Sequence, residues 1–350
     1  LATGLAVGTG AVAAPNVLTH GLISTAEAQD KPAAAPKTFS YPGKSDKLVS
    51  LGERPLVAET PESLLNDDTT PIDKFFIRNN GQIPEPFKGN PDSWKIVIDG
   101  EVNNKLEITL GELKTKFKPV TRRMVLECGG NGRSFFNPPA RGNQWTNGGV
   151  GCAEWTGVRL ADVLKAAGVK PSAKFTGNYG ADRSLADGTK DAISRGVPIK
   201  KALDVNNLIV WGMDGQPLPN IHGGPVRLII PGWPGSVSSK WFTRMWVRDK
   251  YHDGPGMGAT SYRVAIKPMV PGAKPEPDNF RDLESMPVRS IITQPANGTT
   301  FGKEVREVKL RGAAWAGDLT VRRVDISTDF GATWQQAQLS APKNPYDWQR

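Results

Sequence analysis

The residues best suited to chemistry lie together at positions 124–133, MVLECGGNGR. An apolar run ends at the thiol of Cys128, which predicts the end of a buried strand. The glycines that follow let the backbone adopt positive φ angles and approach a ligand closely. Successive amide N–H groups in such a turn bind anions, and the planar guanidinium of Arg133 suits an oxyanion. This stretch therefore offers a soft nucleophile or metal ligand beside an anion site.

The only other cysteine of the chain is Cys152. In an exported protein two cysteines commonly form a disulfide, so a Cys128–Cys152 bridge is an alternative to a ligand role. The chain would then be an exported binding protein without enzyme activity. There is no CxxCH motif for a covalently bound haem and no His/Cys cluster with zinc spacing. The residues alone leave both roles of Cys128 open.

Length and composition predict two domains rich in strands and loops. The chain has 350 residues, of which 38 are glycine and 29 are proline, and its hydrophobic content is 38%. The net charge is +9, but the 44 lysines and arginines are scattered. A scattered charge argues against nucleic acid as a partner and is compatible with an anionic substrate or an acidic partner.

The elements that must position these residues are short strands with few helices. Residues 94–100 and 106–109 are predicted to form a hairpin, and residues 110–117 a short helix. The apolar run before Cys128 is predicted to be a central strand. The spacing of residues 158–167 predicts a second helix that ends at Gly168. Further strands are predicted at 174–179, 207–213, 226–230 and 240–248.

Composition divides the chain into five segments. Residues 1–28 have the character of a secretory leader whose basic start is missing, since an apolar stretch too short to span a bilayer ends in an A-x-A cleavage pattern. Residues 29–50 are predicted to be an extended tail. A main domain is expected at 51–267 and a Pro-rich linker at 268–287. Residues 288–350 show the short alternating strands of an Ig-like β-sandwich, with about four of the usual roughly seven strands present, so we expect the sequence to be incomplete at both ends.

The chain resembles the sulfite oxidase family of molybdopterin enzymes in seven motifs that occur in the family's order. These motifs are FFIRNN, ECGGNGR, NPPARGNQW, GCAEWTGVRLADVL, NIHGGPVRLIIPG, SSKWF and TSYR. The resemblance implies an α+β protein. Residues 51–267 would form a mixed α/β molybdopterin-binding catalytic domain, followed by an Ig-like dimerisation domain at 288–350.

The resemblance also implies roles for individual residues. Cys128 would bind molybdenum as a thiolate, a soft ligand suited to such a centre, beside the two pterin sulfurs and oxo or water groups. The residues expected to hold the pterin and its phosphate are Phe76, Arg78, Asn79, Asn80, Asp182, His222, Arg227, Ser238, Ser239 and Lys240. The residues expected around the substrate are Arg78, Arg133, Arg141, Trp145 and Tyr262.

The activity implied by the resemblance is that of a sulfite dehydrogenase, which oxidises sulfite to sulfate with water. With no haem expected in this chain, the electrons would pass to an external c-type cytochrome. We expect an exported, periplasmic homodimer without membrane insertion that follows the twin-arginine route. Two alternatives share the motifs: the sulfane dehydrogenase subunit of a thiosulfate-oxidising complex, and a related reductase of S- or N-oxides.

Overall fold

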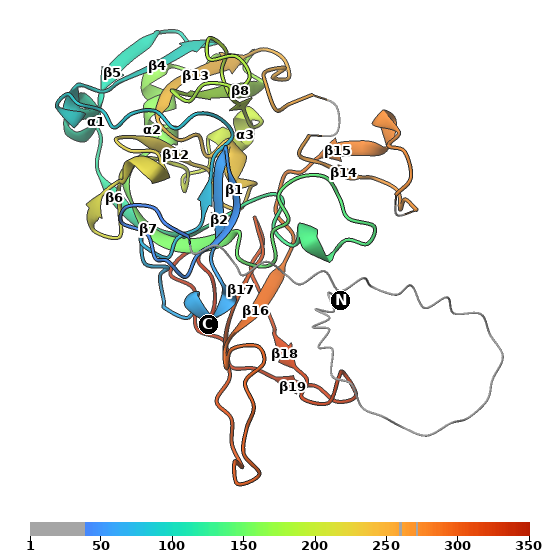
Figure 1. Cartoon of the computed structure of the whole chain (residues 1–350). Helices are drawn as coiled ribbons and strands as arrows, with labels where there is room; N and C mark the ends of the chain where they lie inside the picture. Colours follow the sequence, from blue (N-terminus) through green and yellow to red (C-terminus); the bar gives the residue numbers. More distant parts are fainter. Residues whose placement is uncertain (1–38, 259–260, 271) are drawn as a thin grey trace.

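A computed structural model describes residues 39–258, 261–270 and 272–350 (Figure 1). The expected leader at 1–28 therefore lies outside the described residues, as does the first part of the expected tail. The described chain is mostly β, with short α-helices α1 (Leu110–Lys116), α2 (Leu160–Ala167) and α3 (Ile199–Ala202). Short 3-10 turns are η1 (Glu62–Leu64), η2 (Pro91–Ser93), η3 (Arg133–Phe135), η4 (Asn220–His222), η5 (Gly235–Val237) and η6 (Pro277–Asn279). A mixed α/β region followed by a β region is thus confirmed.

Two five-stranded sheets form the main domain. The first has the order β5-β4-β13-β8-β9, in which only β4 and β13 run parallel. Its strands are β4 (Lys95–Gly100), β5 (Leu106–Thr109), β8 (Phe175–Gly180), β9 (Ser194–Arg195) and β13 (Phe242–Arg248). The second is antiparallel, with β10 pairing with β7, β11 and β12, and β7 pairing with β6. Its strands are β6 (Val120–Glu127), β7 (Val150–Arg159), β10 (Leu208–Met213), β11 (Gln216–Pro217) and β12 (Arg227–Ile229).

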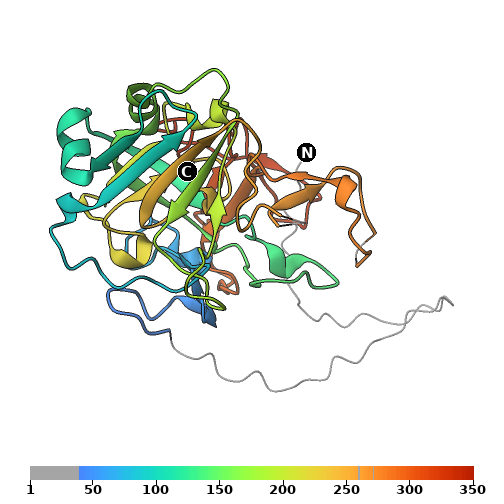
Figure 2. The ribbon, with the colours of Figure 1, turned by 90° about the horizontal axis from the view of Figure 1, so that it is seen from above.

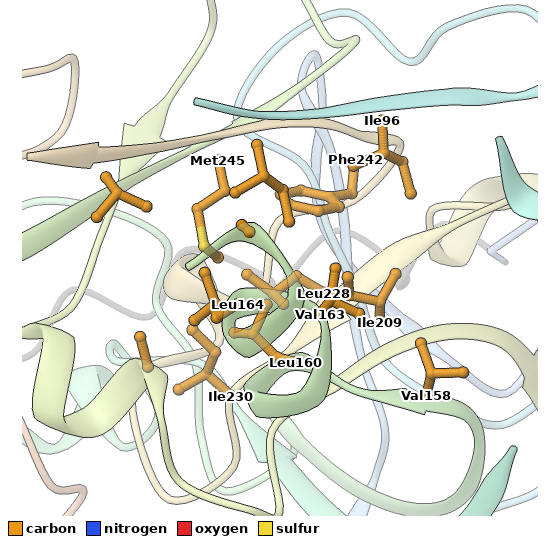
Figure 3. Packing of buried hydrophobic residues seen from close by; sticks show 14 of the residues in the cluster. Ile96, Val158, Leu160, Val163, Leu164, Ile209, Leu228, Ile230, Phe242 and Met245 are labelled. Atoms are coloured by element: carbon orange, nitrogen blue, oxygen red, sulfur yellow. The ribbon is translucent and has the colours of Figure 1, made fainter. Parts of the chain in front are cut away.

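Helix α2 fills the space between these sheets (Figure 3). Its buried residues Leu160, Val163 and Leu164 pack in one cluster with side chains of β4 and β13 from one sheet and of β7, β10 and β12 from the other. The expected helix at 158–167 begins two residues later because β7 continues to Arg159. It ends where predicted, at Gly168, which adopts a φ of +68°.

An additional three-stranded sheet precedes the main sheets. Strands β1 (Val49–Glu53), β2 (Leu56–Glu59) and β3 (Ile77–Arg78) pair in that order. The expectation of an extended tail up to residue 50 is wrong from residue 39 onward. Phe39 and Leu48 are buried against Ile77 and Ile221, so two apolar side chains anchor this segment to the domain.

The linker expected at 268–287 is also more structured than predicted. Strand β15 (Phe280–Asp282) lies within it and pairs with β14 (Arg263–Ala265). Beyond it, β16 (Arg289–Gln294) pairs with β17 (Arg311–Trp315), and β18 (Asp325–Ile326) pairs with β19 (Gln335–Gln336). The four expected strands are therefore present in the described residues as two separate two-stranded sheets.

The C-terminal region packs closely against the main domain, as the orange and red segments of Figure 2 show. Ile291, Ala313 and Trp315 share a buried cluster with Val125 of β6 and Cys152 of β7. This contact places the second region directly behind the strand that leads to Cys128. Across the described residues we find no helix with the length and apolarity needed to cross a membrane.

Candidate functional site

Cys128 directly follows β6, where the chain leaves the sheet. Its amide N–H donates to the carbonyl of Gly149 at 2.8 Å, which extends the β6–β7 pairing by one residue. The chain then turns, with the N–H of Asn131 donating to the Cys128 carbonyl at 2.9 Å. Gly132 adopts a φ of +80°, a conformation that glycine reaches without strain. The strand and glycine turn predicted around this thiol are therefore present.

The thiol of Cys128 is unpaired and lines a cavity. Both cysteines are free, so the alternative of a Cys128–Cys152 disulfide is wrong for this structure. Cys152 points into the interface with the second region, where its Sγ lies 3.4 Å from Oδ1 of Asp347. Burial raises the pKa of the Cys128 thiol, while the positive charges of Arg78 and Arg133 lower it. A positive environment of this kind favours a thiolate once a cation is bound.

The cavity with its mouth encloses about 720 Å³ and gathers most of the expected site residues. Segments far apart in sequence line it: β3 with the residues after it, the Cys128 turn, the end of β8, the η4–β12 turn and the η5–β13 loop. Of the expected residues, those along its wall are Phe76, Arg78, Asn79, Asn80, Cys128, Asp182, His222, Arg227, Ser238, Ser239, Lys240 and Tyr262. Their individual roles stay predictions.

One wall of this cavity is strongly positive. Arg227 of β12 is buried and donates from Nη1 to the His222 carbonyl at 2.9 Å and from Nη2 to the Ser238 carbonyl at 3.0 Å, while its Nε has no partner. Lys240 donates to Asn79 Oδ1 at 2.8 Å and to the Ile221 carbonyl at 2.7 Å. Burial lowers the pKa of Arg227 to about 9 and also lowers the pKa of Lys240. These cations are held by neutral acceptors rather than by carboxylates.

A lysine that the sequence did not single out supports this wall from outside the cavity lining, through His222. Nζ of Lys44 lies 3.0 Å from Nε2 of His222 and donates to the Phe75 carbonyl at 2.6 Å. Burial lowers the pKa of Lys44 to about 7, partly offset by Asp73. Burial and the neighbouring cations also hold the pKa of His222 well below its usual value. Lys44 lies in the segment expected to be a tail, and only the flanking apolar residues Phe39 and Leu48 could have indicated that the segment packs.

Tyr262 also lines the cavity and lies beside the Cys128 turn. It adopts a φ of +51°, which is unusual for a non-glycine residue. A Cβ on Gly129 would lie 3.2 Å from its ring, so the glycine permits this close approach. Arg195 of β9 is only 3% exposed, and its guanidinium stacks on Tyr262, 4.2 Å from the centroid of the tyrosine ring. Arg195 was missed because no local pattern distinguishes one arginine of a short strand.

Three expected substrate residues lie outside the lining of this cavity. Arg133 lies next to the turn, where its Nη1 donates to the Asn143 carbonyl at 3.0 Å. Trp145 is fully buried behind Phe76, with ring centroids 5.8 Å apart in an edge-to-face arrangement. Arg141 is exposed on the loop 136–144. The structure therefore places Arg133 near the thiol, Trp145 in the supporting core and Arg141 at the surface.

The wall fits an anionic, phosphate-bearing cofactor. Buried Arg227 and half-buried Lys240 bring two cationic groups together on it, and among the residues that line the cavity Asp182 is the only carboxylate. Burial raises the pKa of Asp182 to about 6, with Lys240 lowering it in part, so this carboxylate is a poor counter-charge. The unpartnered Nε of buried Arg227 offers a further donor. Donors without acidic partners are the arrangement that a phosphate needs.

Comparisons with known proteins agree with this chemistry. The oxidoreductase molybdopterin binding domain matches residues 80–256, and the Mo-co oxidoreductase dimerisation domain matches residues 281–350. Mitochondrial sulfite oxidase of Rattus norvegicus is 33% identical over 320 residues, which cover 88% of this chain and 57% of the relative. Sulfite oxidase of Gallus gallus is 31% identical over 332 residues, covering 93% and 71%. The chain thus spans little more than half the length of the mitochondrial relatives.

A solved structure shows the same architecture. The sulfane dehydrogenase SoxCD from Paracoccus pantotrophus superposes with a TM-score of 0.68 at 25% identity, over 95% of this chain and 79% of that one. The two matched family domains follow each other in the same order as the two regions of the structure, and the cavity described above belongs mainly to the first. The chain belongs to the sulfite oxidase family of molybdopterin-binding oxidoreductases.

Proposed function

We propose that this protein is a sulfite dehydrogenase. It oxidises sulfite with oxygen from water, giving sulfate, two protons and two electrons, and the electrons leave to an external c-type cytochrome. The observation that carries the proposal is the unpaired Cys128 thiol in a cavity whose other wall holds buried cations without acidic partners. The similarity to sulfite oxidases supports the choice of substrate.

The residues of the positive wall would hold the molybdenum cofactor. Arg227, Lys240 and the Ser238–Ser239 segment would bind its anionic end, and Cys128 would bind the metal, since all of them line the same cavity. Burial and the nearby Lys44 lower the pKa of His222, which keeps its imidazole neutral. A neutral imidazole has one nitrogen that donates a hydrogen bond and one that accepts. When bound, the molybdenum centre supplies oxygen-atom transfer and accepts two electrons.

The arginines near the thiol would bind the substrate anion. Arg78 lines the cavity and Arg133 lies beside the turn, and both are close enough for their charge to act on Cys128. Guanidinium groups bind oxyanions through paired hydrogen bonds and offset the charge of sulfite and sulfate. Tyr262, held against Gly129, would donate a hydrogen bond on the same side.

The partners and location follow from this activity. A c-type cytochrome accepts one electron at a time. Two cytochrome molecules would therefore be reduced for each sulfite that is oxidised. The apolar, leader-like composition of residues 1–28 supports an exported, periplasmic enzyme as part of this proposal, and the match of residues 281–350 to a dimerisation domain supports a homodimer. The net charge of +9 favours an acidic surface on the partner.

The test combines metal analysis with turnover on one sample. We expect about one molybdenum per chain, because one thiolate serves one metal. We also expect cytochrome c reduction that depends on free sulfite and yields two electrons per sulfite. Purified protein that contains molybdenum but does not oxidise free sulfite would refute the proposed substrate, and protein without molybdenum or pterin would refute the site.

A second candidate is the sulfane dehydrogenase subunit of a thiosulfate-oxidising complex. The structural similarity to SoxCD over 95% of this chain favours it. Such an enzyme would act on sulfur bound to a carrier protein. Turnover that requires a persulfide-bearing carrier protein, with none on sulfite, would establish this candidate in place of the first.

A further inference from the structure

The buried carboxylate of Glu127, the residue before Cys128, is contacted by side chains of both domains. Glu127 ends β6 and is only 3% exposed. Nδ2 of Asn131 donates to its Oε1 at 3.0 Å, and Nε1 of Trp315 donates to its Oε2 at 2.8 Å. Nε of Arg289 forms an ion pair with its Oε1 at 2.8 Å. We call Glu127, Asn131, Arg289 and Trp315 the Glu127 clamp.

The clamp holds the Cys128 turn itself as well as the end of the strand. Nη2 of Arg289 donates to the Asn131 carbonyl at 2.6 Å. The side-chain Oδ1 of Asn131 accepts the N–H of Gly149 at 3.0 Å, and its own N–H donates to the Cys128 carbonyl at 2.9 Å. One guanidinium is therefore ion-paired with the residue before Cys128 and hydrogen-bonded to the residue three positions after it.

Both outer members of the clamp come from one hairpin of the second region. Arg289 begins β16, Trp315 ends β17, and the two are directly paired across the hairpin. Because they face each other, one docking position of the hairpin delivers both groups to the same carboxylate. Gly132 leaves room for this approach, since a Cβ there would lie 2.8 Å from Nη1 of Arg289.

We propose that the Arg289–Trp315 pair is a positioning device for the Cys128 turn. Residues 128–132 keep the conformation that presents the thiol to the cavity only while this hairpin is docked. The second region thus contributes to the site of the first, in addition to any part in assembly. The inference rests on the proposed function in one respect, the role of Cys128 as the metal ligand.

An alternative is that these contacts merely hold two domains together, and the chain offers a matched control. Arg311 begins β17 of the same hairpin and forms an ion pair with Asp68 of the main domain, Nη2 to Oδ1 at 2.7 Å. Its side chain is 42% exposed and it has no contact with Glu127. Arg311→Met removes an inter-domain ion pair on the hairpin but leaves the clamp intact.

The experiment compares Arg289→Met with Arg311→Met in the full chain. We expect Arg289→Met to speed amide hydrogen exchange of residues 128–132 at least about tenfold, because losing a hydrogen bond from a charged group shifts the local opening equilibrium by that order. In full-length chain made without pterin, alkylation of Cys128 should rise similarly. Arg311→Met should leave both rates within about threefold of wild type, because exposed ion pairs contribute little.

Two further variants keep the test decisive if Arg289→Met folds poorly. Arg289→Lys keeps the charge but cannot bond to Glu127 and the Asn131 carbonyl with one planar group, so we expect an intermediate exchange rate. Glu127→Gln combined with Arg289→Met removes the unpaired buried carboxylate, so the chain should fold while the turn stays loose. Exchange and alkylation rates in Arg289→Met that match either wild type or Arg311→Met would overturn the proposal. Neither readout needs sulfite turnover, so this failure is distinct from failure of the proposed activity.

Discussion

Two regions near the Cys128 turn, the inner wall of the cavity and a rim outside its lining, are organised very differently. The inner wall consists of buried His222, Arg227 and Ser238 and half-buried Lys240, and each of its cations has at least two fixed hydrogen-bond acceptors. The outer rim, consisting of η3 and the loop 136–144, lies outside the lining of the cavity and is mostly exposed. There Arg133 makes one bond to a loop carbonyl and Arg141 is exposed.

This difference shows that the fold fixes the cations of the inner wall more firmly than the arginines of the rim. Buried cations are costly unless a partner compensates for them, and carbonyl acceptors compensate only in part. The inner wall therefore calls for a permanent anionic ligand, as a cofactor would be. The rim carries no such cost, and its arginines can exchange a water shell for a small anion that comes and goes. We expect substitutions in the wall to affect cofactor content and those in the rim to affect substrate affinity.

The largest effect is expected at the Cys128 thiol, which lines the cavity. Cys128→Ser should abolish measurable turnover, because a serine hydroxyl is a hard donor that does not replace a soft thiolate. Cys152→Ser is the matched control, since that thiol points into the domain interface. Metal analysis and steady-state assays of both variants test this. Turnover lost equally in both variants would show that the sheet, rather than the ligand, had been damaged.

In the inner wall, Arg227→Met should lower molybdenum and pterin content roughly tenfold or more, a size typical of lost support around a metal site. The substitution keeps the apolar length but removes the cation that links the His222 and Ser238 carbonyls. Arg244→Met, which removes a half-exposed cation paired with Asp99, serves as the control. Full cofactor content in Arg227→Met would contradict the expectation that the wall, unlike the rim, holds the cofactor.

At the rim, Arg133→Ala should raise KM for sulfite roughly tenfold to hundredfold while molybdenum content stays normal. That range corresponds to the loss of one charge-assisted hydrogen bond of about 1.5–3 kcal/mol. Arg141→Ala should change KM by less than about threefold, because an exposed and unorganised side chain contributes little. Steady-state kinetics on metal-matched samples measure both. Equal effects of the two substitutions would mean that the rim closes around the substrate as one unit.

The smallest effect is expected at Asp182, the carboxylate among the cations of the wall. Its pKa is raised to about 6, above that of an unfolded aspartate, so the folded protein binds the proton more tightly between about pH 4 and 6. Stability of the cofactor-free protein should therefore fall as pH rises through this window. Asp182→Asn should match wild type near pH 4 and be more stable by about 1–3 kcal/mol at pH 7. Urea unfolding at both pH values measures the difference, and parallel pH profiles for the two proteins would contradict it.

Local patterns predicted the elements around the site well. The apolar run before Cys128, the helical spacing up to Gly168 and the β-branched run at 226–230 each correspond to an element of the described structure. What local patterns missed depends on partners remote in sequence. Strand β7 was not predicted, and its last two residues were assigned to the helix expected at 158–167, because the pairing of Val158 and Arg159 with β10 cannot be seen locally.

The site residues divide in the same way. Those carried by the family motifs converge on one cavity, apart from Arg133, Arg141 and Trp145. Lys44 and Arg195 were missed because one buried lysine or arginine has no signature in its own segment. Glu127 stood next to the thiol in the sequence, but nothing local indicated that Arg289 would neutralise it from a position 162 residues away.

By itself, the sequence determined which chemistry is available: one thiol after a buried strand, a glycine turn, and arginines spaced as in the sulfite oxidase family. Hydrophobic periodicity and turn residues act over a few positions, so they encode local elements directly. Only the tertiary structure decided that the thiol is unpaired, that the cations of the wall lack acidic partners, and that the second region grips the Cys128 turn. Burial and ion pairing between distant segments are properties of packing, and they exist only once the sheets and the second region have assembled.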